Sequence, residues 1–281
     1  KGVVIRHENV AWQCAARRAR YPGAAARTLA IYSFGFDSCI APITWTLLSG
    51  GTLSFLGPTE RQDPRCVRDA IEAGAITHLD AVPSMYAAIL AAPDARRALS
   101  TLELVVCGGE ALPPALVRQH FEVVPGARLF NEYGPTETTV FATVHECTVE
   151  DADGAVPIGA PVAGAEAWVL DARGRLTPLG HPGELHVGGA GVGAGYLGQP
   201  ERSRQRFVER DGQRRYRTGD RVRLAPRGVL EFLGRVDDQL QVRGFRVEPA
   251  EVEQALARQP GIAEAVVVAL DAEAGSRLVA Y

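Results

Sequence analysis

Apolar residues in the first half of the chain form short runs that alternate with longer stretches of helical periodicity. The short runs are bounded by Gly, Pro or Asp, as buried strands usually are. The predicted strands are residues 27–32, 52–56, 76–81 and 102–107. The predicted helices between and after them are residues 64–73, 84–91 and 114–121. Strands and helices that alternate in this way predict parallel sheets covered by helices, which is an α/β fold.

The pattern changes after Glu150. Residues 154–235 are rich in Gly and Pro and hold short β-branched runs (AWVL, ELHVG, VLEFLG), which predict antiparallel strands and a small β-barrel. From Asp237 a strand-like run, a helix that opens with Pro-Ala-Glu and a last strand predict a small α+β unit. The predicted domains are therefore residues 1–236 and residues 237–281.

Composition and charge narrow the class of protein. The chain has 281 residues, 46% hydrophobic and 22% charged, as expected of a globular protein with a sizeable core. Its net charge of -3 gives no reason to expect a nucleic acid or an anionic membrane as partner. We find no apolar run long enough to span a membrane, and the start does not resemble a signal peptide. Scattered cysteines without CxxC spacing favour a reducing, cytoplasmic location over disulfides or a zinc site.

The most informative segment is NEYGPTETT, residues 131–139, which directly follows the apolar run ARLF. Its Gly-Pro predicts a turn, and the surrounding residues supply a phenol, hydroxyls and carboxylates. Ligands of open α/β sheets bind at the carboxyl ends of the strands, so we expect these groups to face a cleft. The alternative is an ordinary polar β-turn, which the whole nonapeptide argues against.

NEYGPTETT resembles the adenine- and magnesium-binding signature of adenylate-forming enzymes, specifically the amino-acid-adenylating domains of nonribosomal peptide synthetases. Further motifs of that family occur in order along nearly the whole chain: KGVVIRHENV, FDSC with LLSGGTL, GELHVGGAGVGAGYLG, YRTGD and GRVDDQLQVRGFRVEPAEVE. The resemblance implies an enzyme that joins an amino acid to AMP, using ATP and Mg²⁺, in a synthetase of the kind that makes peptide antibiotics.

The resemblance also assigns the purine site. Tyr133 would stack on adenine, and Asn131 would hydrogen-bond the adenine amino group. The backbone wall along the nucleotide would come from Gly108, Gly109 and Glu110, in the sequence CGGEAL.

Four more residues of these motifs would serve the phosphates and the ribose. Thr136 would meet the α-phosphate, and Glu137 would hold Mg²⁺, which usually binds one or two carboxylates plus phosphates. Asp220 is suited to grip both ribose hydroxyls, because one carboxylate accepts two hydrogen bonds. Arg235 would reach the ribose or phosphates. The predicted catalytic residues are Thr136, Glu137 and Arg235.

A second glycine-rich segment, GGAGVGAG, is given no catalytic role. It satisfies Gly-x-Gly-x-x-Ala at residues 189–194, which suggests a dinucleotide fingerprint, but it is not predicted to open a helix. The family usually carries an Arg before the following Gly-Tyr, and Ala194 stands at that position here.

Asp37 matches the aspartate that pairs with the substrate α-ammonium in amino-acid-activating members of the family. Relatives that activate plain carboxylic acids lack it, so Asp37 favours an amino acid. Register with the motifs gives the rest of the pocket, and the predicted positions are Asp37, Ser38, Ala41, Asp80, Val106, Gly108, Glu132, Val140 and Phe141.

Asp80 and Glu132 place two further carboxylates in an otherwise small or apolar pocket. Buried carboxylates need a cationic partner, and a planar guanidinium suits two of them better than an ammonium does. We therefore predict arginine, or a cyclised derivative such as capreomycidine or enduracididine, as the substrate. The alternative is that one of the carboxylates points away or pairs with an arginine of the protein.

The resemblance makes Asp237 the hinge of a mobile C-terminal subdomain, and Gly244 a lining residue of the tunnel for a carrier protein's phosphopantetheine. The partners it implies are an amino acid and a peptidyl carrier protein; it leaves open the need for an MbtH-type activator. Lys1 is the only lysine, so we expect the family's adenylation lysine, like its phosphate loop, outside this chain, both domains being incomplete. Competing interpretations are an acyl- or aryl-CoA ligase of the same superfamily, and a degenerate domain that acts as a scaffold.

Overall fold

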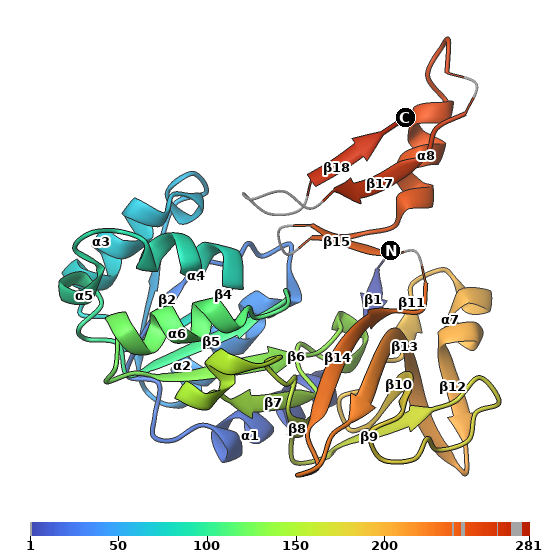
Figure 1. Ribbon diagram of the computed structural model, residues 1–281, viewed down its shortest axis with the longest axis horizontal. Helices are drawn as coiled ribbons and strands as arrows, with labels where there is room; N and C mark the ends of the chain where they lie inside the picture. Colours follow the sequence, from blue (N-terminus) through green and yellow to red (C-terminus); the bar gives the residue numbers. More distant parts are fainter. Residues whose placement is uncertain (1, 238, 243–244, 263, 271–276) are drawn as a thin grey trace.

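Figure 1 shows three parts of the computed structural model, which describes residues 2–237, 239–242, 245–262, 264–270 and 277–281. A large sheet flanked by helices lies beside a second, antiparallel sheet. The C-terminal unit stands above the two (Figure 1). This arrangement agrees with the predicted α/β fold and with the smaller last unit.

The large sheet has seven strands, and the first five of them along its width run parallel. The last two strands are antiparallel to their neighbours. Across the sheet the strands are β3 (Thr52–Phe55), β2 (Arg27–Ala30), β4 (His78–Ala81), β5 (Leu104–Gly108), β6 (Arg128–Tyr133), β7 (Thr143–Glu146) and β8 (Ala160–Pro161). The predicted parallel strands are therefore confirmed, with ends that differ by two residues or fewer from the predicted ones.

Helices cover both faces of this sheet. One face carries α3 (Pro64–Gly74), α4 (Pro83–Leu90), α5 (Ala95–Ala98) and α6 (Pro114–Val123), and the other carries α1 (His7–Arg20) and α2 (Ile40–Leu48). Successive strand residues point to opposite faces. On β5, Val105 and Cys107 pack with α3 to α6, whereas Leu104 and Val106 pack with α2. Short 3₁₀ turns complete the region: η1 (Asp37–Cys39), η2 (Glu60–Gln62), η3 (Thr136–Thr138) and η4 (Val149–Asp153).

The second sheet is antiparallel, as predicted, and curls around the long strand β13 (Gln213–Leu224). One edge of β13 pairs with β10 (Pro182–Gly189), which in turn pairs with β9 (Ala165–Leu170). The other edge pairs first with β12 (Phe207–Arg210) and then with β14 (Leu230–Arg235). Beside this half-barrel lie β1 (Val3–Val4), β11 (Gly195–Tyr196) and α7 (Pro200–Arg206).

The C-terminal unit contains two antiparallel strand pairs and one helix. Its elements are β15 (Leu240–Val242), β16 (Phe245–Val247), α8 (Pro249–Ala257), β17 (Val267–Leu270) and β18 (Arg277–Ala280). Helix α8 begins at a proline, whose fixed φ suits the first helical position.

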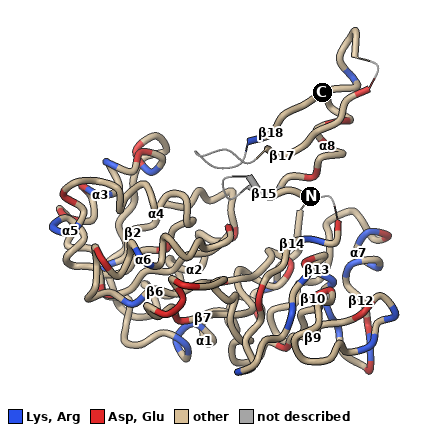
Figure 2. Tube along the Cα trace, viewed as in Figure 1, with Lys and Arg blue, Asp and Glu red and all other residues tan. Residues whose placement is uncertain are grey.

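Figure 2 shows basic and acidic residues interspersed over the large sheet and the half-barrel. Among the described residues, no helix has the length and apolar character needed to cross a bilayer.

Candidate active site

A cleft of about 2010 Å³ opens between the carboxyl end of the large sheet and the C-terminal unit. Its walls include Val82 after β4, Gly108 and Gly109 at the end of β5, and Val267 of β17. Six predicted site residues line it: Ser38, Gly108, Gly109, Glu110, Arg235 and Asp237. The cleft therefore lies where the strand order predicts a ligand site.

The NEYGPTETT segment ends β6 and turns back on itself. A side chain at Gly134 has no room, because an added Cβ would lie 2.3 Å from Phe141 Cα and 2.6 Å from Val140 O. Thr139 and Val140 adopt positive φ angles of 61° and 74°, which few side chains tolerate. This strained double turn holds η3 at the edge of the sheet.

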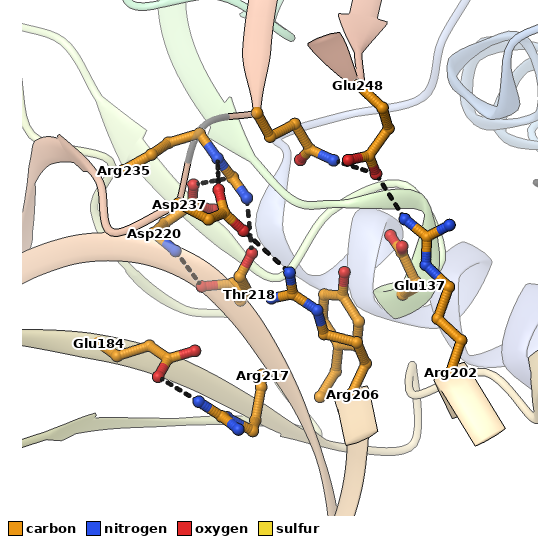
Figure 3. Close-up of polar contacts among 12 residues, drawn as sticks. Glu137, Glu184, Arg202, Arg206, Arg217, Thr218, Asp220, Arg235, Asp237 and Glu248 are labelled. Atoms are coloured by element: carbon orange, nitrogen blue, oxygen red, sulfur yellow. Dashed lines mark hydrogen bonds and ion pairs between the residues drawn. The ribbon is translucent and has the colours of Figure 1, made fainter. Parts of the chain in front are cut away.

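Figure 3 shows a network of carboxylates and guanidiniums on the half-barrel, and Tyr133 links this network to the turn. Asp220, which is 6% exposed, accepts hydrogen bonds from the Tyr133 hydroxyl and from Arg235. Arg235 Nε donates to Asp237 at 2.7 Å, and Arg206 donates to the same carboxylate at 2.9 Å. Burial alone would raise the pKa of Asp237, but these two guanidiniums outweigh burial and hold that pKa below its ordinary value. Three predicted residues, the predicted hinge among them, thus form one ion-pair network.

Asp37, Thr136 and Glu137 meet beside the turn. Burial raises the pKa of Asp37, although hydrogen bonds from Thr136 and from the Ser38 backbone counteract it. Glu137 is fully buried and accepts a hydrogen bond of 2.6 Å from the Tyr196 hydroxyl. The predicted ammonium ligand therefore adjoins the predicted α-phosphate residue.

The residues predicted to form a backbone wall, Gly108, Gly109 and Glu110, all line the cleft. Gly109 has a φ of 83°, in the left-handed region that glycine tolerates. Glu110 accepts from the backbone N–H and the hydroxyl of Ser84, both at 2.9 Å. Asn131 is buried, and its side-chain amide donates to Pro157 O at 2.8 Å.

Two of the predicted pocket positions, Asp80 and Glu132, contact a residue that the sequence did not reveal. Arg17 of α1 is fully buried, and both Asp80 and Glu132 bind it. Its Nη2 lies 2.7 Å from each oxygen of Glu132, and its Nη1 lies 3.1 Å from Asp80 Oδ2. The premise of the arginine prediction, two carboxylates without a cation of the protein, was wrong. The alternative, a pair with an internal arginine, is what the structure contains.

The electrostatics of this cluster follow from its burial. Burial raises the pKa of Asp80 and of Glu132, and the Arg17 charge opposes it in both. The Tyr21 hydroxyl also donates to Glu132. The Arg17 guanidinium lies 5.1 to 5.5 Å from the ring centroids of Tyr21, Trp45 and Phe141. The ion pair is therefore enclosed by aromatic rings, which leave it little screening by water.

His78 shares this interior and predicts a pH dependence of stability. Burial first, and then the Arg17 charge, lower the pKa of His78 from 6.5 to about 4. The unfolded chain then binds more protons than the folded chain between these values, so stability rises with pH there. The free energy of unfolding should fall by about 3 kcal/mol as the pH drops from 6.5 to 4. Denaturant titrations at several pH values measure this slope.

In the variant His78→Gln, the part of the pH dependence of the unfolding free energy that comes from His78 should disappear. The variant His181→Gln, at an exposed position, is the control for the loss of a histidine. An unchanged slope in the His78 variant would contradict the assignment.

Among the described residues, one group of three potential metal ligands lies together: His145, Cys147 and Asp151. None of them lines the cleft. Asp151 accepts from Thr148 N at 2.7 Å and contacts His145 Nε2 at 2.9 Å, as part of the cap of η4. Burial raises the pKa of the Cys147 thiol, which disfavours the thiolate that metals prefer. The group is thus explained as a helix cap.

Comparison with known families decides the class. A family model described as AMP-binding enzyme matches residues 1–197. The chain belongs to this family. Among relatives, tyrocidine synthase 3 of Brevibacillus parabrevis is 39% identical over 287 residues, and bacitracin synthase 3 of Bacillus licheniformis is 38% identical over 286. These matches cover 100% of this chain but span only 4% of either relative.

Solved structures of nonribosomal peptide synthetases also resemble this chain. PA1221, an NRPS protein with adenylation and PCP domains bound to a vinylsulfonamide inhibitor, matches with a TM-score of 0.85 and 31% identity. That match covers 92% of this chain and 46% of the other. A four-domain nonribosomal peptide synthetase, AB3403, bound to AMP and glycine, matches with a TM-score of 0.75 and 34% identity, over 100% of this chain and 21% of that one. The predicted resemblance to adenylation domains of nonribosomal peptide synthetases is confirmed.

The glycine-rich segment of this chain packs against the NEYGPTETT turn. Thr139 donates to Gly191 O at 2.7 Å, and Gly193 N donates to Glu137 O at 2.9 Å. An added Cβ at Gly191 would lie 2.3 Å from the Trp12 ring of α1. The glycines therefore serve close packing here, and as expected no helix follows directly. The predicted tunnel residue Gly244 lies outside the described residues.

Proposed function

We propose that the protein containing this chain activates an amino acid with ATP, forming aminoacyl-AMP and pyrophosphate, and then transfers the aminoacyl group to the phosphopantetheine thiol of a carrier protein. The observation that carries the proposal is that Asp37 lies close enough to Thr136 and Glu137 for both to shift its pKa. This proximity joins an acceptor for an α-ammonium to a hydroxyl that suits the α-phosphate. A substrate held by both would have its carboxylate beside the phosphorus that it attacks.

Residues of β6 and of the half-barrel supply the nucleotide site in this proposal. Tyr133 offers its ring to adenine, and Asn131, whose amide N–H₂ already donates to Pro157, would accept from the adenine amino group through its oxygen. Asp220 would exchange part of its contact with Arg235 for the ribose hydroxyls. The released guanidinium could then turn towards the phosphates, where it would offset negative charge.

The donor set fits Mg²⁺, which the family uses. Glu137 is a buried carboxylate next to the predicted α-phosphate residue, and Mg²⁺ in nucleotide sites binds one or two carboxylates together with phosphate oxygens. When bound, the ion would neutralise charge on the phosphates as pyrophosphate leaves. Tyr196, which donates to Glu137, would hold that carboxylate in position.

Transfer to the carrier protein requires the cleft to open to a second substrate. Asp237 lies where the half-barrel meets the C-terminal unit and is held by Arg235 and Arg206 (Figure 3). We propose that rotation of the C-terminal unit at this hinge breaks these ion pairs. The rotation would switch the protein from the conformation for adenylation to the conformation for transfer to the carrier protein. PA1221, which contains adenylation and PCP domains, supports a carrier protein as the partner.

Asp37→Ala tests the proposal. Loss of a hydrogen bond between charged groups should reduce ATP–pyrophosphate exchange with the preferred amino acid by about 10- to 100-fold. The assay uses the full adenylation protein that contains this chain. Asp153→Ala removes a carboxylate whose side chain is 84% exposed and is the matched control.

The same assay separates the second candidate, an acyl- or aryl-CoA ligase. Exchange that persists with acids lacking the α-amino group, is insensitive to Asp37→Ala and yields an acyl-CoA would replace our proposal by that activity. AB3403, which binds AMP and glycine, favours the amino-acid reaction. Arginine, or a derivative such as capreomycidine or enduracididine, is the substrate hypothesis from the sequence, and the Arg17 ion pairs weigh against it. A panel of amino acids tests it.

A further inference from the structure

The Arg17 cluster lies directly behind the wall of the cleft. Period-two alternation places Asp80, Val106, Phe130 and Glu132 on the face of the sheet that α1 and α2 cover, in the registers Asp80 to Val106 and Val106 to Phe130. Gly108, which lines the cleft, adjoins Glu132: a Cβ there would be 3.5 Å from Glu132 Cβ. The cluster itself does not line the cleft. Gly108 is the residue that separates Glu132 from the space that a substrate side chain would enter.

The contacts within the cluster are unequal. Glu132 receives two N–H bonds of 2.7 Å from Arg17 and one bond from Tyr21. Asp80 receives a single bond of 3.1 Å at Oδ2, and its Oδ1 has no hydrogen-bond partner among the described residues, although Asp80 is only 4% exposed. A buried carboxylate oxygen left without a partner is unusual in a folded protein. Asp80 is therefore the one acceptor in the cluster with capacity for a ligand.

We propose that Arg17 is a specificity-determining residue that occupies the place of a substrate cation, so that the substrate carries an uncharged hydroxyl or carboxamide side chain that bonds Asp80 Oδ1. This inference rests on the proposed function and narrows its substrate. Glu132 takes up the Arg17 charge through two N–H bonds, and burial raises the pKa of Asp80 towards the neutral acid. A substrate guanidinium or ammonium would then meet the Arg17 charge in a poorly screened pocket with little negative charge left to balance it. A hydroxyl or carboxamide both donates and accepts, so it suits Asp80 in either protonation state.

Arg17 lies outside the predicted set of pocket positions, because it comes from a helix that precedes all of them. The pocket's specificity therefore depends on a residue that comparison of those positions alone would omit. Removing Arg17 would leave Asp80 and Glu132 facing a space shaped for a guanidinium. The same pocket would then favour the cationic substrate that the bare carboxylates suggest.

ATP–pyrophosphate exchange by the full adenylation protein tests this inference with serine, threonine, asparagine and glutamine against arginine, lysine, glutamate and leucine. The wild type should prefer one of the first four over arginine by at least ~10-fold. Arg17→Ala should raise the ratio of arginine to that substrate by at least ~10-fold, whereas Arg18→Ala, an exposed neighbour, should not. Arginine as the best wild-type substrate, or an unchanged ratio in a folded Arg17→Ala, would overturn the proposal.

A binding measurement separates this inference from the reaction itself. Guanidinium ion at low millimolar concentration should raise the Tm of Arg17→Ala but not of Arg18→Ala, because it refills the vacated site. If Arg17→Ala fails to fold, the double variant Arg17→Ala with Glu132→Gln replaces it, because it buries one unpaired charge fewer. Its Tm with and without guanidinium ion is then compared with that of Arg18→Ala. No exchange with any amino acid, together with guanidinium rescue of Tm, would reject the proposed function while keeping the Arg17 site.

Discussion

Replacement of Gly134 by alanine is expected to reduce amino-acid-dependent exchange by about 100-fold. The added Cβ would meet three backbone atoms, Phe141 Cα at 2.3 Å, Val140 O at 2.6 Å and Phe141 C at 2.8 Å. Backbone cannot yield as a flexible side chain does, so the turn itself must shift. Thr136 and Glu137 follow on the same turn, and a displacement of about 1 Å at reacting groups costs about 100-fold in rate.

The same change should lower the free energy of unfolding by about 1–3 kcal/mol, as overpacking does in well-packed interiors. Exchange kinetics and denaturant titrations measure the two effects. Gly126→Ala is the matched control, because no atom lies within 4 Å of the added Cβ at this exposed loop position. Wild-type exchange in Gly134→Ala would show that the turn tolerates a shift and would refute its role in placing η3.

Much of the fold was predictable because the strands of the large sheet are short, buried and bounded by turn residues. All four residues of β4 are buried, and so are four of the five in β5. Strands covered on both faces appear in sequence as continuous apolar runs. The order of the runs and the helices between them then fixes a parallel sheet, since parallel neighbours need a crossover.

Helices α1 and α2 escaped prediction for opposite reasons. Helix α2 is apolar on every side (IAPITWTLL), so it has no polar stripe to reveal a helical period. Helix α1 buries polar residues instead, Asn9, Gln13 and Arg17, at intervals of four. Such a buried polar stripe was the one signal in the sequence that could have revealed the role of Arg17.

In the candidate site, too, some residues could be predicted from the sequence and others could not. Residues within one motif, such as Tyr133 and Thr136, could be placed near each other because the end of β6 and the turn directly after it hold both. Partners separated by more than a hundred residues could not, as for Arg17 and Glu132. Their meeting depends on which helix covers which face of the sheet, and the pattern of single residues does not carry that information.

Replacement of Glu132 by alanine is expected to be the most destabilising single change in the pocket. It would leave Arg17, fully buried, with only the bond of 3.1 Å to Asp80. Removing one partner of a buried ion pair costs about 3–5 kcal/mol, because the remaining charge stays uncompensated. Urea or guanidinium titration measures the loss. Glu146→Ala is the control: its pair with Arg128 at 2.6 Å is partly exposed and should contribute about 0–1 kcal/mol.

A double-mutant cycle shows whether the uncompensated charge is the cause. Arg17→Met removes the cation, so Arg17→Met combined with Glu132→Ala should be less destabilised than the sum of the two single variants. Residues that share a buried network commonly couple by about 0.5–3 kcal/mol. Strict additivity would mean that the loss in Glu132→Ala comes from the cavity and from the Tyr21 bond alone. In that case Arg17 would not depend on Glu132, and the buried ion pair would contribute nothing to the stability of this pocket.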